Sequence, residues 1–293
     1  MLFEVIALDA GGSSVKSARV SAQHQVIGGR RDDIDSLADR AHIIGELARI
    51  IQTHINAANG EPAGVAFSFP GPFDYPNGIC LIQHTSHSAG VKYGALYGVN
   101  LRDALREELH RPALPITFRN DGEAAILGEA RFGAGKGQRR LIGITLGTGL
   151  GSAFLVDGLP QVGGAGVPPN GWLYCLTYDG STADDAFSTR GLLARLQNSG
   201  CPFNNIKAAA NADDDVARRC FADFGAALGA FLAPFALAFK ADAVIALGGI
   251  TQAWDKFGPA MQAALPAPAM RGELGDDAAL LGAADLLLSP FAG

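Results

Sequence analysis

The sequence predicts an α/β protein with two lobes, each built on a mixed sheet, and a cleft between the lobes. The first observation is length, because 293 residues suffice for two domains of ordinary size. The second is composition, since 48% hydrophobic and 18% charged residues are typical of a globular enzyme and not of a disordered chain. The third is a repeat, in which a strand hairpin, a helix, a strand and a helix follow one another twice.

The repeat is visible in two segments, "EVIALDAGGSSVKSARV" and "RLIGITLGTGLGSAFLV". Each has about five strand residues, a turn of Gly with Ser or Thr, and a second strand, and the copies are offset by about 138 positions, from Asp9 to Gly147. Apolar spacing predicts a helix over 36–58 in the first half and another over 216–239 in the second. A strand and a turn follow each helix, in "PAGVAFSFPG" and in "DAVIALGGI".

The segment "RPALP" indicates where the lobes divide, because its prolines end the helix "LRDALREELH" before the strand "ITF". We therefore expect an N-terminal lobe over residues 1–118 and a C-terminal lobe over 119–293. The last helix, at about 277–289, is expected to pack back on the N-terminal lobe. Ligands should bind where strand ends meet across the cleft.

Charge and cysteine content exclude several classes of protein. A net charge of -6 argues against a nucleic-acid partner, and the densest basic segment, "GKGQRR", is interpreted as a loop. The four cysteines lack C-x-x-C spacing, which predicts a reducing, cytoplasmic location. The N-terminus has no positively charged region of a signal peptide. The apolar stretch at 224–239 is too short for a membrane span, so we expect a buried helix and no membrane partner.

Three glycine-rich turns follow predicted strands: "DAGGSS" at 9–14, "LGTGLGS" at 146–152 and "LGGIT" at 247–251. Such turns bind phosphates because backbone N–H groups approach an anion closely when no Cβ intervenes. Any one of them alone is compatible with an ordinary tight hairpin. Three at strand ends, two of them in duplicated positions, favour a nucleotide site.

The sequence does not match two other nucleotide-binding motifs. A Walker loop is excluded, because the Gly-Lys pair at 135–136 is followed by Gly137 and has Ala130 where the first glycine is required. The alternating glycines of 147–151 precede "SAFLV", which is strand-like, whereas a dinucleotide fingerprint opens a helix.

Polar residues beside these turns are candidates for binding a metal ion, a phosphate and the substrate, and for catalysis. A carboxylate such as Asp9 would repel bound phosphates unless a cation lay between them, which predicts Mg²⁺, bound directly or through water. Lys16 either neutralises a phosphate or points to solvent. Asp121 either caps the helix that follows it or accepts the proton of a substrate hydroxyl. Asn120 and the turn "SFPGPFD" at 68–74 would supply hydrogen bonds to the substrate.

These motifs, in order and over nearly the whole chain, resemble the ROK family of sugar kinases and related repressors. "LDAGGSSVK" looks like the first phosphate motif of that family, "FSFPGPFD" like its sugar-side turn and "RNDGEAAILGEARFGAG" like its catalytic Asn-Asp segment. "LGTGLGSAFLVDG" is similar to its second phosphate motif, "VIALGGI" to its adenosine-side turn and "LGDDAALLGAADL" to its C-terminal helix. The resemblance implies a two-lobed actin/hexokinase-like (ribonuclease H-like) fold.

The resemblance also implies ATP-dependent phosphorylation of a hexose or N-acetylhexosamine hydroxyl, at C6, with Asp121 as general base and Mg²⁺ at Asp9. The residues that it places at the nucleotide are Asp9, Gly11, Gly12, Ser13, Lys16, Gly147, Thr148, Gly149, Gly248 and Gly249. Those that it places at the sugar are Gly71, Asn120, Asp121, Asn170 and Asp185. A homodimer is a further expectation, because dimers are common in the family.

The chain departs from the family where many members bind structural zinc through a Glu-x-Gly-His motif and a cysteine cluster. No histidine follows His110, and Cys175 is the one cysteine between 159 and 200. A tetrahedral zinc site of that type lacks its ligands here, so no zinc is expected.

The same departure leaves the function open, because the matching stretch, 166–191, lacks the Glu and His that hold sugar hydroxyls. Asn170 and Asp185 are the nearest replacements. One alternative is therefore a sugar-binding regulator with weak or absent activity. Another is a polyphosphate-using glucokinase, since zinc-free relatives that accept polyphosphate share the G-G-S-x-x-K form of residues 11–16. A repressor would carry a winged-helix module ahead of the first phosphate motif, which begins here at about the fifth residue.

Overall fold

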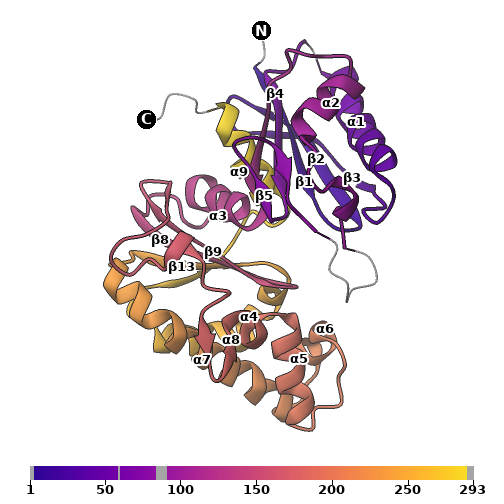
Figure 1. The fold of residues 1–293 in the computed structure, drawn as a ribbon. Helices are drawn as coiled ribbons and strands as arrows, with labels where there is room; N and C mark the ends of the chain where they lie inside the picture. Colours follow the sequence, from indigo (N-terminus) through magenta and orange to yellow (C-terminus); the bar gives the residue numbers. More distant parts are fainter. Residues whose placement is uncertain (1–2, 59, 84–90, 289–293) are drawn as a thin grey trace. The chain divides into compact units, whose positions relative to one another are not determined.

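The computed structural model describes residues 3–58, 60–83 and 91–288, and the chain forms two compact units (Figure 1). The first unit contains Met1–Gly128 and Asp276–Gly293, and the second contains Glu129–Gly275. These bounds differ from the expected lobes, 1–118 and 119–293. Each unit contains one five-stranded mixed sheet, so the predicted α/β class is confirmed.

The first sheet has the order β3-β2-β1-β4-β7, antiparallel from β3 to β1 and parallel from β1 to β7. Its strands are β1 (Glu4–Ala10), β2 (Ser14–Ser21), β3 (Val26–Asp33), β4 (Gly64–Phe69) and β7 (Ile116–Asn120). All residues of β4 are buried, as expected for a central parallel strand covered on both faces. The sheet has α1 (Arg40–Ala57) and α2 (Leu101–Glu108) on one face and α9 (Asp277–Leu288) on the other (Figure 1).

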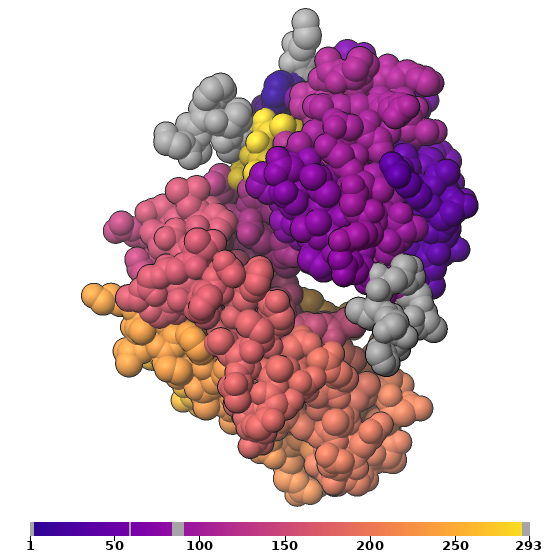
Figure 2. Space-filling model, in the orientation of Figure 1, coloured from indigo at the N-terminus to yellow at the C-terminus, as the bar shows by residue number. Residues whose placement is uncertain are grey.

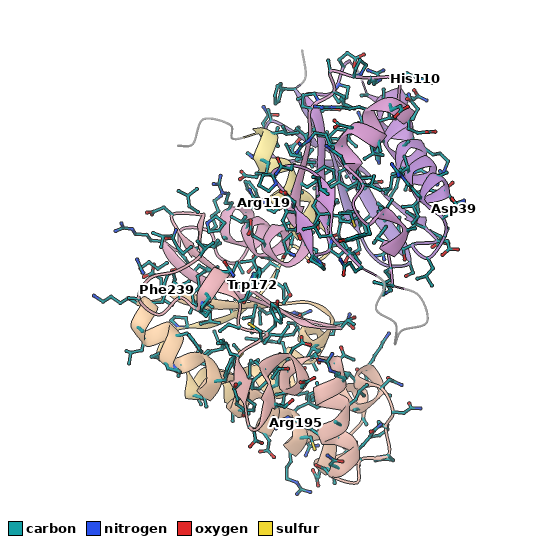
Figure 3. All side chains as sticks on the ribbon, in the orientation of Figure 1. Asp39, His110, Arg119, Trp172, Arg195 and Phe239 are labelled. Carbon is teal, nitrogen blue, oxygen red and sulfur yellow. The ribbon has the colours of Figure 1, made fainter. Side chains whose placement is uncertain are left out.

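Local signals fix the bounds of α1, which was expected over 36–58. The Asp39 carboxylate accepts a hydrogen bond from the backbone N–H of His42 at 2.9 Å, so Asp39 is the N-cap and the helix begins at Arg40 (Figure 3). Between β4 and α2, the first unit adds the short strands β5 (Phe73–Asp74) and β6 (Ile79–Cys80) and the 3-10 turn η1 (Gly94–Leu96).

Helix α9 explains why the units do not divide at 118–119. It crosses the beginning of α3 (Asp121–Phe132) so closely that a Cβ at Gly128 would overlap the carbonyl of Ala278, and one at Gly282 would overlap that of Ala124. Most of α9 is buried, and Figure 2 shows a part of it, in yellow, at the surface beside early segments of the chain. The start of α3 therefore belongs to the first unit. Residue 289 of the expected helix lies outside the described residues.

The second sheet has the order β10-β9-β8-β13-β14, again antiparallel and then parallel. Its strands are β8 (Arg140–Leu146), β9 (Leu150–Val156), β10 (Leu159–Gln161), β13 (Ala243–Leu247) and β14 (Ala269–Arg271). The other elements of this unit are β11 (Thr177–Tyr178), β12 (Ser181–Thr182), α4 (Ala183–Phe187), α5 (Thr189–Asn198), α6 (Ile206–Asn211), α7 (Asp215–Phe239), α8 (Trp254–Ala264), η2 (Pro169–Gly171) and η3 (Gly249–Ala253). The correspondence of β1 with β8 and of β4 with β13 is the predicted repeat.

Helix α7 contains the apolar stretch at 224–239. Among the described residues, it is the one helix whose length and apolar character would let it span a membrane. Phe221, Phe224 and Leu228 are fully buried in the core of the second unit, where α7 packs on α8. At its end, the Arg140 guanidinium lies 4.3 Å from the ring centroid of Phe239 (Figure 3). Core packing thus accounts for the apolar face of α7.

Candidate active site

Polar side chains line one edge of the first sheet, at the carboxyl ends of its parallel strands. Asp9 of β1 pairs in register with Ser68 of β4, and Phe69 of β4 pairs with Asn120 of β7. The Ser68 hydroxyl donates a hydrogen bond to Asp9 Oδ1 at 2.7 Å. Because parallel strands end at a common edge, Asp9 and the Asn120-Asp121 pair lie on the same side of the sheet, where ligands of α/β proteins bind.

The cap of α3 is made by Asn120 and not by Asp121. Asn120 Oδ1 accepts a hydrogen bond from the backbone N–H of Glu123 at 3.1 Å, which is the geometry of an N-cap. Asp121 Oδ1 accepts from the adjacent N–H of Gly122 at 2.8 Å. The capping role that the sequence suggested for Asp121 is therefore filled by its neighbour, and Asp121 stands at the positive end of the helix dipole.

The Asp121 carboxylate is a stronger base than an ordinary aspartate. Burial among the surrounding protein groups raises its pKa most, the Gly122 N–H lowers it, and the negative charge of Asp9 raises it further. The side chain nevertheless keeps an exposed surface, so that a substrate can reach it from solvent. A reachable carboxylate with a raised pKa suits proton acceptance near neutral pH.

Tyr75 joins the predicted sugar-side residues, although no sequence motif includes it. Its hydroxyl accepts a hydrogen bond from Asn120 Nδ2 at 3.0 Å and donates to the carbonyl of Phe69 at 3.2 Å. A Cβ at Gly71 would lie 3.1 Å from the same hydroxyl. Gly71, Asn120 and Asp121 are thus brought together around Tyr75, and the available signal was a tyrosine directly after the turn at 68–74.

The carbonyl groups of the first glycine turn are hydrogen-bonded to other residues of the first unit. The Gly11 carbonyl accepts a hydrogen bond from the Tyr93 hydroxyl at 2.6 Å, and the Gly12 carbonyl accepts one from the Ser36 hydroxyl. The Ser13 carbonyl accepts one from the Ile34 N–H at 3.1 Å. A carbonyl oxygen facing a phosphate would repel it, whereas N–H groups attract it. With its carbonyls bound on the protein side, the turn fits an anion better than a free hairpin would.

Lys16 forms ion pairs beside this turn. Its Nζ lies 2.6 Å from Asp276 Oδ1 and 3.7 Å from Asp9 Oδ2. Arg31 Nη2 contacts the other oxygen of Asp276 at 2.7 Å. The hydrogen bond from Lys16 is the main reason why the pKa of Asp276 is lowered. Lys16 therefore lies next to Asp9. Of the two interpretations of Lys16, the one in which its side chain makes no contact and points to solvent does not hold.

The second unit presents its own turns at the ends of β8 and β13. The Gly147 carbonyl accepts hydrogen bonds from the N–H and the hydroxyl of Thr189, both at 2.8 Å. Gly248 has φ +93°, and a Cβ there would lie 2.5 Å from the Leu146 carbonyl oxygen. That conformation and that approach require glycine. The turns at 147–149 and 248–249 are adjacent, because β8 pairs with β13.

Gly147 and Gly249 differ from Gly248. Within the described part of the chain, no atom of a residue beyond their own turn lies within 4 Å of a Cβ placed on either residue, and neither has a positive φ. The fold therefore does not require glycine at these two positions. Open space beside a glycine turn lets a phosphate approach the backbone, and the Gly147 N–H itself holds the turn by donating to the Gly149 carbonyl at 3.1 Å.

Asp184, and not Asp185, contacts the second turn. Asp184 Oδ1 accepts a hydrogen bond from the Leu150 N–H at 2.6 Å. Asp185 forms a capping box with Thr182 at the start of α4 and also accepts from Arg190 at 2.8 Å. The sugar-side role expected of Asp185 stays a prediction, and the contact of Asp184 with the second turn is an addition to the expected site.

Asn170 lies in η2 with φ +58°, a backbone conformation that asparagine tolerates better than most residues. Beside it, Trp172, labelled in Figure 3, keeps 47% of its surface exposed and Tyr174 keeps 42%, and their ring centroids lie 5.8 Å apart. The stretch 166–191 therefore presents an exposed aromatic pair.

The described residues fit a magnesium ion better than a zinc ion. Among them, no group of three or more His, Cys, Asp and Glu residues is placed to hold a metal. The expected lack of a zinc site stays a prediction. A single carboxylate such as Asp9, next to a phosphate-binding turn, matches the usual protein share of a Mg²⁺ shell that is completed by water and substrate phosphates.

The ROK family model matches residues 5–289. A glucokinase of Thermotoga maritima is 28% identical over 165 residues, which are 56% of this chain and 48% of that protein. A polyphosphate glucokinase of Mycobacterium leprae is 33% identical over 153 residues, 52% of this chain and 43% of that protein. The chain thus matches about half the length of these curated relatives.

The fold is shared over the whole chain. The crystal structure of a ROK family glucokinase from Streptomyces griseus, in complex with glucose and AMPPNP, superposes with a TM-score of 0.71 at 22% identity. The alignment covers 97% of this chain and 98% of that one. With a family model that matches almost every residue and a fold that agrees, the chain belongs to the ROK family.

Proposed function

We propose that the protein is a cytoplasmic, ATP-dependent sugar kinase that phosphorylates the C6 hydroxyl of a hexose or N-acetylhexosamine. The observation that carries this proposal is Asp121, a reachable carboxylate with a raised pKa beside Asp9 and the first glycine turn. Because Asn120 caps α3, Asp121 is not needed for that purpose. A group in this position suits the base that receives the hydroxyl proton as the hydroxyl attacks a phosphate.

The sugar side rests on residues around Asn120. Asn120 uses Oδ1 for the helix cap and one N–H for Tyr75, and its amide also stabilises the charged form of the Asp121 carboxylate, so it positions the base beside the sugar-side turn. Gly71 leaves room beside the Tyr75 hydroxyl. Holding the hydroxyl in line with the phosphate supplies much of the rate in phosphoryl transfer, because little covalent chemistry falls to the protein. Asn170 and Asp185 stay proposed sugar-side residues.

The phosphate side rests on Asp9, Lys16 and the glycine turns. In the first unit, the N–H groups of Gly12 and Ser13 bind phosphate oxygens, the Gly11 N–H holds the turn by donating to the Ser14 carbonyl at 3.0 Å, and Asp9 holds Mg²⁺ through water. When bound, Mg²⁺ offsets the negative charge of the phosphates. In the second unit, residues 147–149 bind phosphates and residues 248–249 lie at the adenosine. The support is the open space beside Gly147 and Gly249.

Replacing Asp121 by Asn tests the proposal. We expect kcat to fall about 1,000-fold, in the range that general-base catalysis supplies, while the dissociation constant of the sugar changes less than about threefold. Asp103→Asn is the matched control, because the Asp103 carboxylate lies on the surface of α2, 3.4 Å from Arg106 Nη1, and belongs to no predicted site. Turnover of Asp121→Asn close to that of the wild type would rule out Asp121 as the base.

Two alternatives have specific support. The Mycobacterium leprae relative is a polyphosphate glucokinase, which favours a test of that donor. The missing Glu-His pair favours a sugar-binding regulator. An assay of phosphorylated product, across aldoses and amino sugars and with ATP or polyphosphate as donor, separates the three. Sugar binding without turnover on either donor supports the regulator, and sedimentation of the same samples tests the expected homodimer.

A further inference from the structure

The space above Gly12 in the first glycine turn is filled by a lysine from another segment. A Cβ placed on Gly12 would overlap Cδ, Cε and Nζ of Lys92. Gly12 has no positive φ, so the backbone conformation does not require glycine there. The missing side chain instead makes room for the Lys92 amine, which brings a positive charge to the turn.

The neighbouring residue, Tyr93, fixes the position of Lys92. Tyr93 is fully buried, and its ring lies 4.9 Å from that of Phe69, centroid to centroid. Its hydroxyl donates to the Gly11 carbonyl at 2.6 Å, and its N–H donates to the Ser36 carbonyl at 2.7 Å. The Ser36 hydroxyl in turn donates to the Gly12 carbonyl. This closed set of hydrogen bonds ties the backbone beside Lys92 to the turn that its side chain covers.

The two lysines at the turn have different surroundings. Lys16 lies between the carboxylates of Asp9 and Asp276. Within residues 3–58, 60–83 and 91–288, no carboxylate is within ion-pair distance of Lys92, and its side chain is exposed. An ammonium group without a carboxylate partner retains its full attraction for an incoming anion.

We propose that Lys92 is a phosphate-binding residue, whose amine contacts an oxygen of the donor phosphates at the first glycine turn. The proposal rests on the proposed function only in requiring that a phosphorylated donor binds this turn. The N–H groups of the turn bind one side of the phosphate chain, and Lys92 adds a positive charge above Gly12. Neither the repeat nor the glycine motifs include this residue.

The experiment measures binding of MgATP, and separately of inorganic tripolyphosphate, by calorimetry. Lys92→Met should weaken both ligands about tenfold, the usual size for loss of one charge-assisted hydrogen bond. Lys92→Arg should keep both within about threefold of the wild type. Lys136→Met, which removes an exposed lysine of the second unit, is the matched control and should change neither. The loss in Lys92→Met should shrink at high salt, because salt screens exposed charges.

The proposal is overturned if Lys92→Met binds both ligands within twofold of the wild type. It is also overturned if the wild type binds neither ligand, or if sugar binding weakens as much as MgATP binding. Failure of the kinase proposal is distinguishable. A wild type that binds MgATP in a Lys92-dependent way but phosphorylates no sugar would contradict the kinase proposal and support this one.

Discussion

The two sheets share one strand order but carry different side chains at the carboxyl ends of their parallel strands. At the carboxyl ends of the first sheet are Asp9, Asn120 and Asp121, and the Asp9 charge contributes to the raised pKa of Asp121. The second sheet has Thr145 where the first has Asp9, because each is the last residue of its strand to pair with the parallel neighbour. Its nearest acid, Asp184, is bonded to the N–H of Leu150 within its own unit.

The difference shows how a duplicated backbone can support two roles. Strand order and turn position are common to both copies because the same pattern of strands and helices builds them. The residues placed in the turns decide the local charge. The first sheet thus offers carboxylates for a cation and a proton, and the second offers glycine N–H groups for an anion.

The largest effect is expected at Gly248, where glycine is structural. Gly248→Ala should lower the free energy of unfolding by on the order of 3 kcal/mol, because φ +93° disfavours alanine and the Cβ would lie 2.5 Å from the Leu146 carbonyl oxygen. Gly147→Ala should change stability by less than about 0.5 kcal/mol and instead raise the KM of the donor. Urea denaturation of both variants measures the contrast, and equal losses of stability would contradict it.

A smaller effect is expected for replacement of Asp184 or Asp185 in the second unit. Asp184→Ala removes the acceptor of the Leu150 N–H beside the second turn and should raise the donor KM about tenfold. Asp185→Ala removes a capping box and should leave the donor KM within about twofold. Steady-state kinetics with varied ATP distinguishes the two. A larger change in Asp185→Ala would move Asp185 into the donor site.

The smallest effect is expected in the pH dependence of kcat/KM. Burial and Asp9 raise the pKa of Asp121, so its basic form is lost as pH falls through a value above the ordinary 3.8. The acid limb of kcat/KM should therefore lie above that value. In the second unit, hydrogen bonds from Thr182, Ser181 and Arg190 lower the pKa of Asp185, so Asp185→Ala should not move the limb. A limb at or below 3.8, with circular dichroism showing folded protein, would contradict the assignment.

The sequence predicted the α/β class, the repeat, the glycine turns and the strand-end positions of Asp9 and Asp121. These features depend on short stretches of chain, in which periodicity, glycine and the residue after a strand can be read directly. The confirmed family membership follows from the same motifs, since they occur in order over nearly the whole chain.

Only the tertiary structure decided which residues meet. It showed that Asn120 caps α3 in place of Asp121 and that Asp184 accepts the Leu150 N–H beside the second turn. Contacts such as that of Lys92 with Gly12, or of Lys16 with Asp276 at a separation of 260 residues, join segments distant in the chain. They arise from the packing of whole elements, which no local pattern of residues encodes.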